Sequence, residues 1–119
     1  HIHRVGDMPY LNSALWTATH HRIPMLFVMQ NNRAYHQEVM HLQRMANRRQ
    51  RGMTLAHAGL PGSTISDPNI DFAQMARSMG AYAEGPISDP RDLRPALLRA
   101  VERVEKGEVA LLDTLTQPR

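Results

Sequence analysis

The sequence predicts an α/β fold in which a parallel sheet is flanked by helices on both faces. Short apolar runs alternate with longer helical patterns, in the order β-α-β-α-loop-α-β-α-β, along 119 residues. One run, residues 25–29, is continuously apolar, which is typical of a strand buried on both faces of a parallel sheet. The alternation favours parallel strands because each helix returns the chain to the start of the next strand.

The first predicted elements are a short strand and a helix. Residues 1–5 are β-compatible and lead directly into a Gly-Asp turn, so the chain opens inside a strand and we expect a fragment of a larger domain. A helix is expected over residues 13–22, with Asn12 or Ser13 as N-cap, because either side chain accepts from an unpaired backbone N–H. Trp16 should pack on the side of this helix that faces the sheet.

A strand and a long polar helix follow. Pro24 opens the strand at residues 25–29, and an Asn-Asn pair closes it. Residues 35–51 lack Gly and Pro, and their apolar residues recur at three-residue steps, which indicates a helix. These apolar residues are Val39, Leu42 and Met45. Residues 52–68 contain Gly and Pro turn signals, and a loop is expected there.

The second half of the chain predicts helix, strand, helix and strand. One helix covers residues 71–79 and is followed by Gly80; the other starts at Asp89-Pro90 and is stopped by Gly107. The apolar stripe of the later helix is Leu93, Leu97, Val101 and Val104. The strands are residues 81–87 and 109–115.

The composition is that of an ordinary globular domain or part of one. Hydrophobic residues make up 42% of the chain and charged residues 21%, which argues against global disorder. No apolar run reaches the roughly 18–20 residues of a membrane helix, and no signal-peptide pattern begins the sequence. The absence of cysteine excludes a thiolate site and fits a reducing compartment. The methionines expected to fill the core are Met25, Met29, Met40, Met45, Met75 and Met79.

Polar residues follow two of the predicted strands. Gly6-Asp7 comes after the first strand and Asn31-Asn32 after the second. Each pair alone is explained by a turn or a helix cap. Together they place a carboxylate and a carboxamide at one edge of the sheet, because consecutive strands are usually neighbours and ligands bind at their carboxyl ends. Such oxygen donors suit Mg²⁺, which is usually shared with phosphates.

These residues resemble the thiamine diphosphate-binding motif, in which Gly-Asp-Gly is followed by a helix, a strand and then Asn-Asn. The matching segments are Gly6-Asp7, Ala14 to Ala18, Arg22 to Pro24 and Asn31 to Tyr35. The resemblance is to the decarboxylase, carboligase and acetolactate synthase-like branch, of which benzoylformate decarboxylase is a member. The later helices and the final strand are also similar to the C-terminal, pyrophosphate-binding domain of that family. Residues 1–119 therefore resemble one such domain without its N-terminal part.

The resemblance implies roles for particular residues. Mg²⁺ would take a carboxylate oxygen of Asp7, the side-chain oxygen of Asn32 and the backbone carbonyl of Ala34, and would bridge to the diphosphate. The residues implied in cofactor binding are Gly6, Asp7, Met8, Asn32, Ala34 and Tyr35. Tyr35 would lie beside the cofactor. By analogy, His36 and Glu38 would face a substrate, and otherwise they are ordinary surface residues.

The sequence departs from the family motif just after Asp7. Met8 stands where the family has its third glycine, and Pro9 follows. Glycine allows the backbone to approach the phosphate closely, and proline has no N–H to donate. The segment from Asp7 to Asn32 is also shorter by a couple of residues than is usual in the family. We therefore expect a damaged or remodelled turn with weakened cofactor affinity.

The resemblance also implies an activity and its partners. The family cleaves or joins C–C bonds next to a carbonyl, and a 2-oxo acid is the expected substrate class, with lyase and transferase chemistry both open. The glutamate that activates the cofactor belongs to a pyrimidine-binding domain, which this chain lacks, so no catalytic residue is assigned and the chain alone should lack turnover. We expect the full-length protein to be a cytoplasmic homodimer or homotetramer that binds neither membrane nor nucleic acid.

Two other functions remain open from the residues. The chain would be a structural remnant if Met8 and Pro9 have destroyed the site. The arginine cluster, which carries part of a net charge of +3, would bind nucleic acid by counterion release, although aromatic residues are only 5%. The cluster is Arg44, Arg48, Arg49 and Arg51. A solvated helix face or a contact with a missing domain explains the cluster better than nucleic-acid binding does. The spacing of His36 and His41 argues against a zinc site.

Overall fold

Four parallel strands form one sheet in the order β1-β2-β4-β3 in the computed structural model. The strands are β1 (Ile2–Arg4), β2 (Met25–Asn31), β3 (Tyr82–Ile87) and β4 (Val109–Leu115). The helices are α1 (Met8–His20), α2 (His36–Arg48), α3 (Phe72–Ser78) and α4 (Pro90–Glu105). The structure describes residues 2–4, 6–51 and 62–117. The sequence-predicted loop at 52–68 therefore lies partly outside the described residues.

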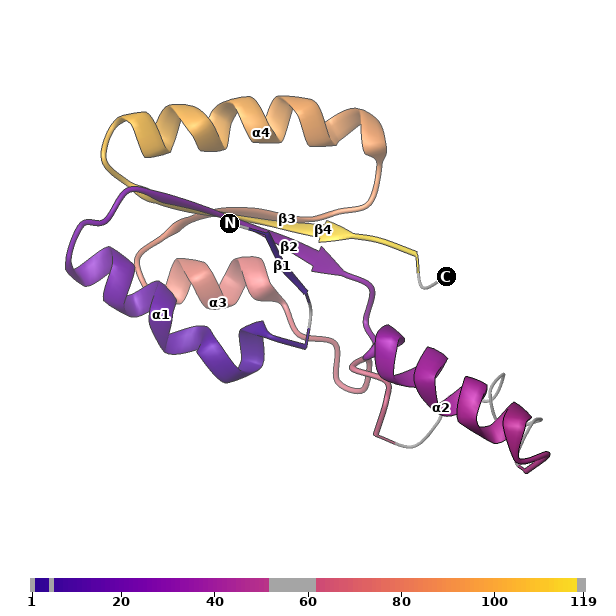
Figure 1. The fold of residues 1–119 in the computed structure, drawn as a ribbon. Helices are drawn as coiled ribbons and strands as arrows, with labels where there is room; N and C mark the ends of the chain where they lie inside the picture. The colour runs from indigo at the N-terminus through magenta and orange to yellow at the C-terminus, as the bar shows by residue number, and fades with distance from the viewer. Residues whose placement is uncertain (1, 5, 52–61, 118–119) are drawn as a thin grey trace.

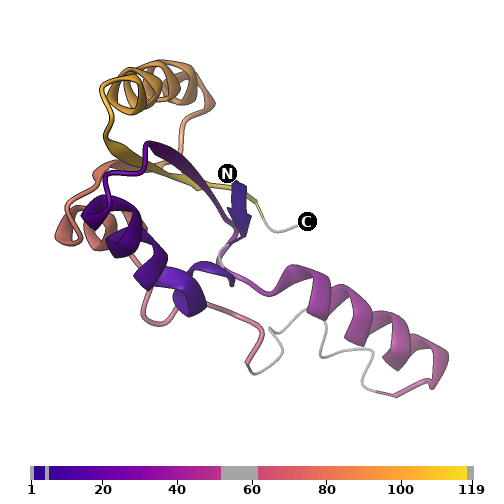
Figure 2. The ribbon, with the colours of Figure 1, turned by 60° about the vertical axis from the view of Figure 1, so that its left-hand side comes forward.

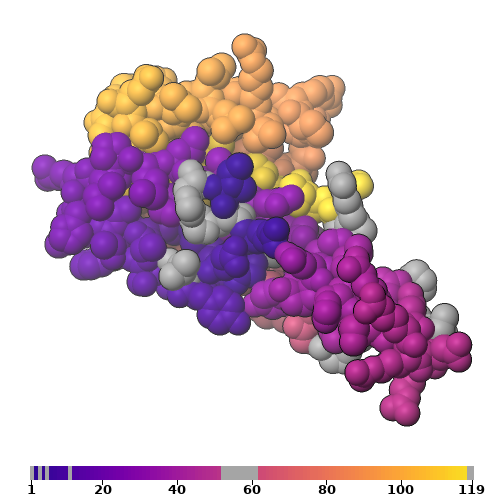
Figure 3. All heavy atoms as spheres, viewed as in Figure 1, coloured from indigo at the N-terminus to yellow at the C-terminus, as the bar shows by residue number. Residues whose placement is uncertain are grey.

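Helices cover both faces of the sheet, as the sequence predicts. Helices α1 and α3 lie on one face and α4 lies on the other (Figure 1). Helix α2 follows β2 but extends away from the sheet, and it contains no buried residue (Figure 2). It forms a separate projection in the space-filling view (Figure 3). The radius of gyration is consequently 16.6 Å, compared with ~13–14 Å for a compact chain of this length.

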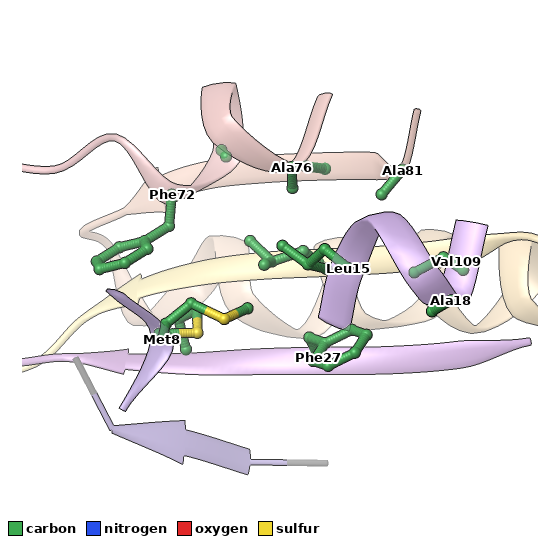
Figure 4. Packing of buried hydrophobic residues seen from close by; sticks show 12 residues of the cluster. Met8, Leu15, Ala18, Phe27, Phe72, Ala76, Ala81 and Val109 are labelled. Atoms are coloured by element: carbon green, nitrogen blue, oxygen red, sulfur yellow. The ribbon is translucent and has the colours of Figure 1, made fainter. Parts of the chain in front are cut away.

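The core consists of two apolar layers separated by the sheet. The larger layer lies beneath α1 and α3 and includes Leu15, Phe27, Phe72 and Leu111 (Figure 4). The smaller layer lies beneath α4 and is formed by Ala96, Ala100, Ala110 and Leu112. Alternate residues of β4 enter the two layers, since side chains alternate across a strand. The strand that is buried on both faces is therefore β4, whereas β2 is only partly buried.

Helix α1 begins earlier than the sequence predicts. Its first residue is Met8, so Asn12 and Ser13 lie inside the helix and the prediction that either residue caps it is wrong. Pro9 fits the first turn because the N–H groups there have no partner within the helix, and the fixed φ of proline suits that position. Pro9 is therefore compatible with the helix start, while the weakened cofactor affinity expected of this turn stays a prediction.

Three apolar side chains are more exposed than the sequence predicts. The exposed fraction is 54% for Trp16, 47% for Met40 and 42% for Val101. Trp16 stacks on His20, one turn later in α1, instead of packing on the sheet. Met40 is exposed because α2 extends away from the sheet. Val101 is exposed because the buried residues of α4 are alanines, which let the helix pack closely on β4.

The second half of the chain agrees closely with prediction. Asp71 caps α3, because its side chain accepts from the Gln74 N–H at 2.7 Å, and Asp89 caps α4 by accepting from the Arg91 N–H at 2.9 Å. The last strand has the predicted bounds, residues 109–115. In the described part of the chain, no helix is long and apolar enough to span a membrane.

A polar network covers the outer strand β3. Arg99 of α4 donates two hydrogen bonds to the Glu84 carboxylate, at 2.8 and 2.7 Å, and the Tyr82 hydroxyl also donates to Glu84. The guanidinium of Arg99, followed by the Tyr82 hydroxyl, holds the pKa of Glu84 below its ordinary value, against the effect of partial burial. The network attaches α4 to the edge of the sheet.

We expect Leu112→Ala to lower the free energy of unfolding by about 2–5 kcal/mol, because it removes a fully buried side chain from the layer under α4. Leu98→Ala is the matched control on α4, where 60% of the leucine is exposed. The control should change stability by less than about 0.5 kcal/mol. Urea denaturation measures both variants, and equal losses would contradict this assignment of the core.

The lowered pKa of Glu84 predicts a loss of stability in acid. Its contribution is complete above the pKa of the unfolded state and disappears as the pH falls through the lower pKa of the folded state. Glu84→Gln should therefore flatten the acid limb of a stability curve measured by chemical denaturation from pH 7 to pH 2. Glu105→Gln is the control, since Glu105 forms no ion pair with a described residue. The same flattening in both variants would contradict the prediction.

Candidate functional site

The carboxyl ends of β1 and β2 meet at one edge of the sheet. The two strands are parallel, and Arg4 is opposite Gln30. Gly6 and Asp7 follow β1 by two and three residues, while Asn32 comes directly after β2. The backbone therefore brings the positions of Asp7 and Asn32 to the same edge of the sheet, as the sequence predicts.

An open cavity of about 570 Å³ lies at this edge, between the strand ends and α2. The predicted site residues that line it are Gly6, Asp7, Asn32, Ala34, Tyr35, His36 and Glu38. Met8 does not line it, because the Met8 side chain is only 1% exposed and packs in the core near Phe72 (Figure 4). The structure thus brings together every predicted site residue except Met8.

Asp7 and Asn32 offer oxygen atoms to the cavity in different ways. The Asp7 side chain is exposed and forms neither a helix cap nor an ion pair with a described residue. The Asn32 amide oxygen accepts from the Ala34 N–H at 3.2 Å and keeps a second lone pair. Among the backbone hydrogen bonds of the described residues, none uses the Ala34 carbonyl.

The turn that carries Ala34 is held by a neighbouring segment. The Tyr35 N–H donates to the Ser63 carbonyl at 2.8 Å, and the Ile65 N–H donates to the Arg33 carbonyl at 2.7 Å. These bonds form an antiparallel bridge between Ala34 and Thr64. The turn after β2 is therefore fixed by backbone contacts on both sides of Ala34.

Gly6 is required by the close approach of Tyr35. A Cβ atom at position 6 would lie 2.3 Å from Cε1 of the Tyr35 ring, a distance that real structures do not show. Tyr35 is also hydrogen-bonded to Tyr10 of α1, and this bond, with a smaller effect of burial, raises the pKa of Tyr35. Tyr35 therefore connects the end of β1, the start of α1 and the start of α2.

Further side chains that the sequence did not assign to the cavity also line it. They include Arg4, Gln37, His41 and Arg44, and Arg4 donates a hydrogen bond to Gln37 across the cavity. The spacing of residues 37, 41 and 44 on one face of α2 was the available signal.

Asp113 is a buried acid that was also missed, although it is conspicuous as the single charged residue of β4. Its carboxylate accepts from the Asn31 side-chain amide at 3.0 Å. Burial raises the pKa of Asp113, while the Asn31 amide and the Phe72 N–H act in the opposite direction.

Other predicted features lie away from the cavity or make no compact site. The arginines at positions 48, 49 and 51 are exposed at the far end of α2. Among the described residues, no group of three or more His, Asp or Glu side chains is arranged to hold a metal. A cation at this edge would consequently need amide and backbone oxygens as well as Asp7.

Residues 6–114 match the family model described as thiamine pyrophosphate enzyme, C-terminal TPP binding domain. The chain belongs to this family. The match covers both halves of the motif and the final strand, so the thiamine diphosphate domain predicted from the sequence is confirmed. No curated protein sequence shows significant similarity to the chain.

Solved structures show the same thiamine diphosphate-binding fold. The thiamine diphosphate-dependent 4-hydroxybenzoylformate decarboxylase of Rhodococcus jostii RHA1 matches with a TM-score of 0.71 and 20% identity over 99% of this chain. The benzoylformate decarboxylase of Polynucleobacter necessarius matches with a TM-score of 0.69 and 16% identity over 99% of this chain. The chain spans 19% of the length of each of these enzymes.

Gly6→Ala should destabilise this domain by about 1–3 kcal/mol, the usual effect of overpacking, because the new methyl group collides with the Tyr35 ring. In a Tyr35→Ala background the same substitution should cost much less, since the colliding ring is gone. Urea denaturation of the four proteins in this double-mutant cycle measures the coupling. An equal cost in both backgrounds would show that Tyr35 is not the reason for glycine at this position.

Proposed function

We propose that this domain supplies the diphosphate and Mg²⁺ anchoring site of an enzyme that cleaves or forms C–C bonds next to the carbonyl of a 2-oxo acid. The observation that carries the proposal is that Asp7, Asn32 and Ala34 line one cavity at the ends of adjacent parallel strands. Family membership supplies the cofactor class, thiamine diphosphate.

The residues present fit a magnesium ion. The Asp7 carboxylate, which forms no ion pair with a described residue, the Asn32 amide oxygen and the Ala34 backbone carbonyl form a set of hard oxygen donors, which Mg²⁺ prefers. With so few protein ligands, the ion keeps positions for phosphate oxygens. The Ser63 and Arg33 backbone bonds would hold Asn32 and Ala34 in place without cofactor.

When bound, thiamine diphosphate supplies the nucleophilic carbon and the electron sink that this chemistry needs. The chain's own residues anchor and orient it: Asp7, Asn32 and Ala34 through the metal, and Tyr35 and Gly6 by shaping the cavity wall. His36 and Glu38 are the polar groups of this chain proposed to face the substrate. The activating glutamate would come from a pyrimidine-binding domain, in a homodimer or homotetramer of the full-length protein.

A site-defective remnant of the same family is the alternative. Met8 favours it, since a buried side chain replaces a glycine that lets the backbone approach phosphate. The distinction is whether the domain still binds the cofactor in a metal-dependent way.

Thiamine diphosphate should stabilise the domain against thermal unfolding only when Mg²⁺ is present. A ligand that binds only the native state adds about 2.7 kcal/mol at 100 times its dissociation constant. Asp7→Ala and Asn32→Ala should each abolish the stabilisation, because each removes one metal ligand. Differential scanning calorimetry with cofactor alone, Mg²⁺ alone and both together measures the effect.

Asp92→Ala is the matched control, an acidic residue in the first turn of α4 on the other face of the sheet. It should keep the full stabilisation. If the wild-type domain shows no Mg²⁺-dependent shift at millimolar cofactor, the proposal is contradicted and the remnant is favoured. A shift that survives in Asp7→Ala and Asn32→Ala would place cofactor binding elsewhere.

A further inference from the structure

A buried carboxylate connects three elements beside the proposed site. Asp113 of β4 is 1% exposed, and its carboxylate accepts from the Asn31 side-chain amide of β2 at 3.0 Å. The Phe72 N–H, at the start of α3, is its other partner. Asp113 therefore joins the end of β2 to the end of β4, and it lies beside the N-terminus of α3, where burial and, to a lesser extent, the charge of Asp71 raise its pKa.

The neighbouring strand β3 approaches the backbone of Asp113 closely. Gly85 of β3 has a φ of +138°, and a Cβ atom there would lie 2.6 Å from the Asp113 carbonyl oxygen and 2.7 Å from its Cβ. Asp113 continues the row of Val109 and Leu111, which face the layer under α1 and α3. A hydrophobic side chain would suit that row better, since burying a carboxylate is unfavourable even when it is hydrogen-bonded. A role other than stability explains the acid.

Asn31 is held to β4 at two points. Its side-chain amide donates to Asp113, and its backbone carbonyl accepts from the Thr116 N–H at 2.9 Å. Asn31 is 5% exposed, and its amide oxygen has no hydrogen-bond partner among the described residues, so Asp113 is what orients the side chain. The next residue is Asn32, the proposed metal ligand.

The Phe72 contact fixes the other end of the same region. Backbone hydrogen bonds with Ser63 and Ile65 hold the turn that carries Ala34. The chain then continues to α3, which begins at Phe72. Asp113 thus lies against both segments that flank this region. One is the end of β2, which precedes the turn, and the other is the start of α3, which follows residues 63–65.

We propose that Asp113 is a positioning residue of the metal and diphosphate site, which acts through Asn31 to set the backbone from which Asn32 and Ala34 project. The inference rests on the proposed function and extends it to a residue outside the motif. Partners of metal ligands act in this way in other proteins, where their loss typically weakens metal affinity by roughly 10- to 100-fold.

The test exchanges the acid and the amide. Asp113→Asn leaves two amides in contact, Asn31→Asp leaves two carboxylates, and the double variant restores an acid–amide pair in the reverse order. Isothermal titration calorimetry measures the affinity for thiamine diphosphate at saturating Mg²⁺, and urea denaturation without ligand measures stability. Each single variant should bind roughly 10- to 100-fold more weakly, and the double variant should bind more tightly than either.

Leu112→Ala is the control for a loss of stability alone. Leu112 is adjacent in β4 but faces the layer under α4, so this variant should be destabilised and keep wild-type affinity in its folded fraction. A variant that is unfolded at 25 °C is titrated in trimethylamine N-oxide beside the wild type in the same solvent, because this osmolyte favours the folded state.

The possible results separate the two proposals. If the wild type binds thiamine diphosphate with Mg²⁺ and the folded single variants bind equally well, Asp113 has only a structural role and the inference is wrong. If affinity falls in the single variants but the exchange does not improve on them, the pairing with Asn31 is not the mechanism. If the wild type itself does not bind, the proposed function fails first, and the inference fails with it.

Discussion

Parallel pairing of β1 with β2, in the register that sets Arg4 opposite Gln30, brings the Gly-Asp turn and the Asn-Asn turn to one edge of the sheet. The rest of the candidate site depends on this register. A second register, that of β2 against β4, also matters, because a shift there by one residue would turn Asn31 away from Asp113, since side chains alternate across a strand. This second register extends over seven residues of β2, from Met25 to Asn31.

The polar groups at the strand ends are organised by a buried acid in the otherwise apolar β4. Burial of the Asp113 carboxylate stabilises the folded state less than burial of an apolar side chain would. Its hydrogen bond, however, holds the Asn31 amide in one orientation. Gly85 of the neighbouring strand leaves room for the backbone of residue 113. Stability and site geometry thus place opposite demands on the end of one strand.

The changed motif residue acquires a different role in this chain. The side chain of Met8, which stands where the family has its third glycine, fills the core at the start of α1, and Pro9 suits the first turn of the helix. The remaining motif glycine, Gly6, is small because the Tyr35 ring packs against it. Glycine in such a motif therefore serves packing within the protein as well as approach to a ligand.

The sequence alone determined the α/β class, the family and most element boundaries, because periodicity, caps and turn residues are local signals. It also placed Asp7 and Asn32 at one edge of the sheet. It misplaced the start of α1 and the packing of Trp16, since helix starts and the buried side of a helix depend on what lies opposite. The contact of Asn31 with Asp113 spans 82 positions, and the approach of Tyr35 to Gly6 joins two different strand ends. Only the tertiary structure decided these contacts, because no local pattern records which distant residues the sheet brings together.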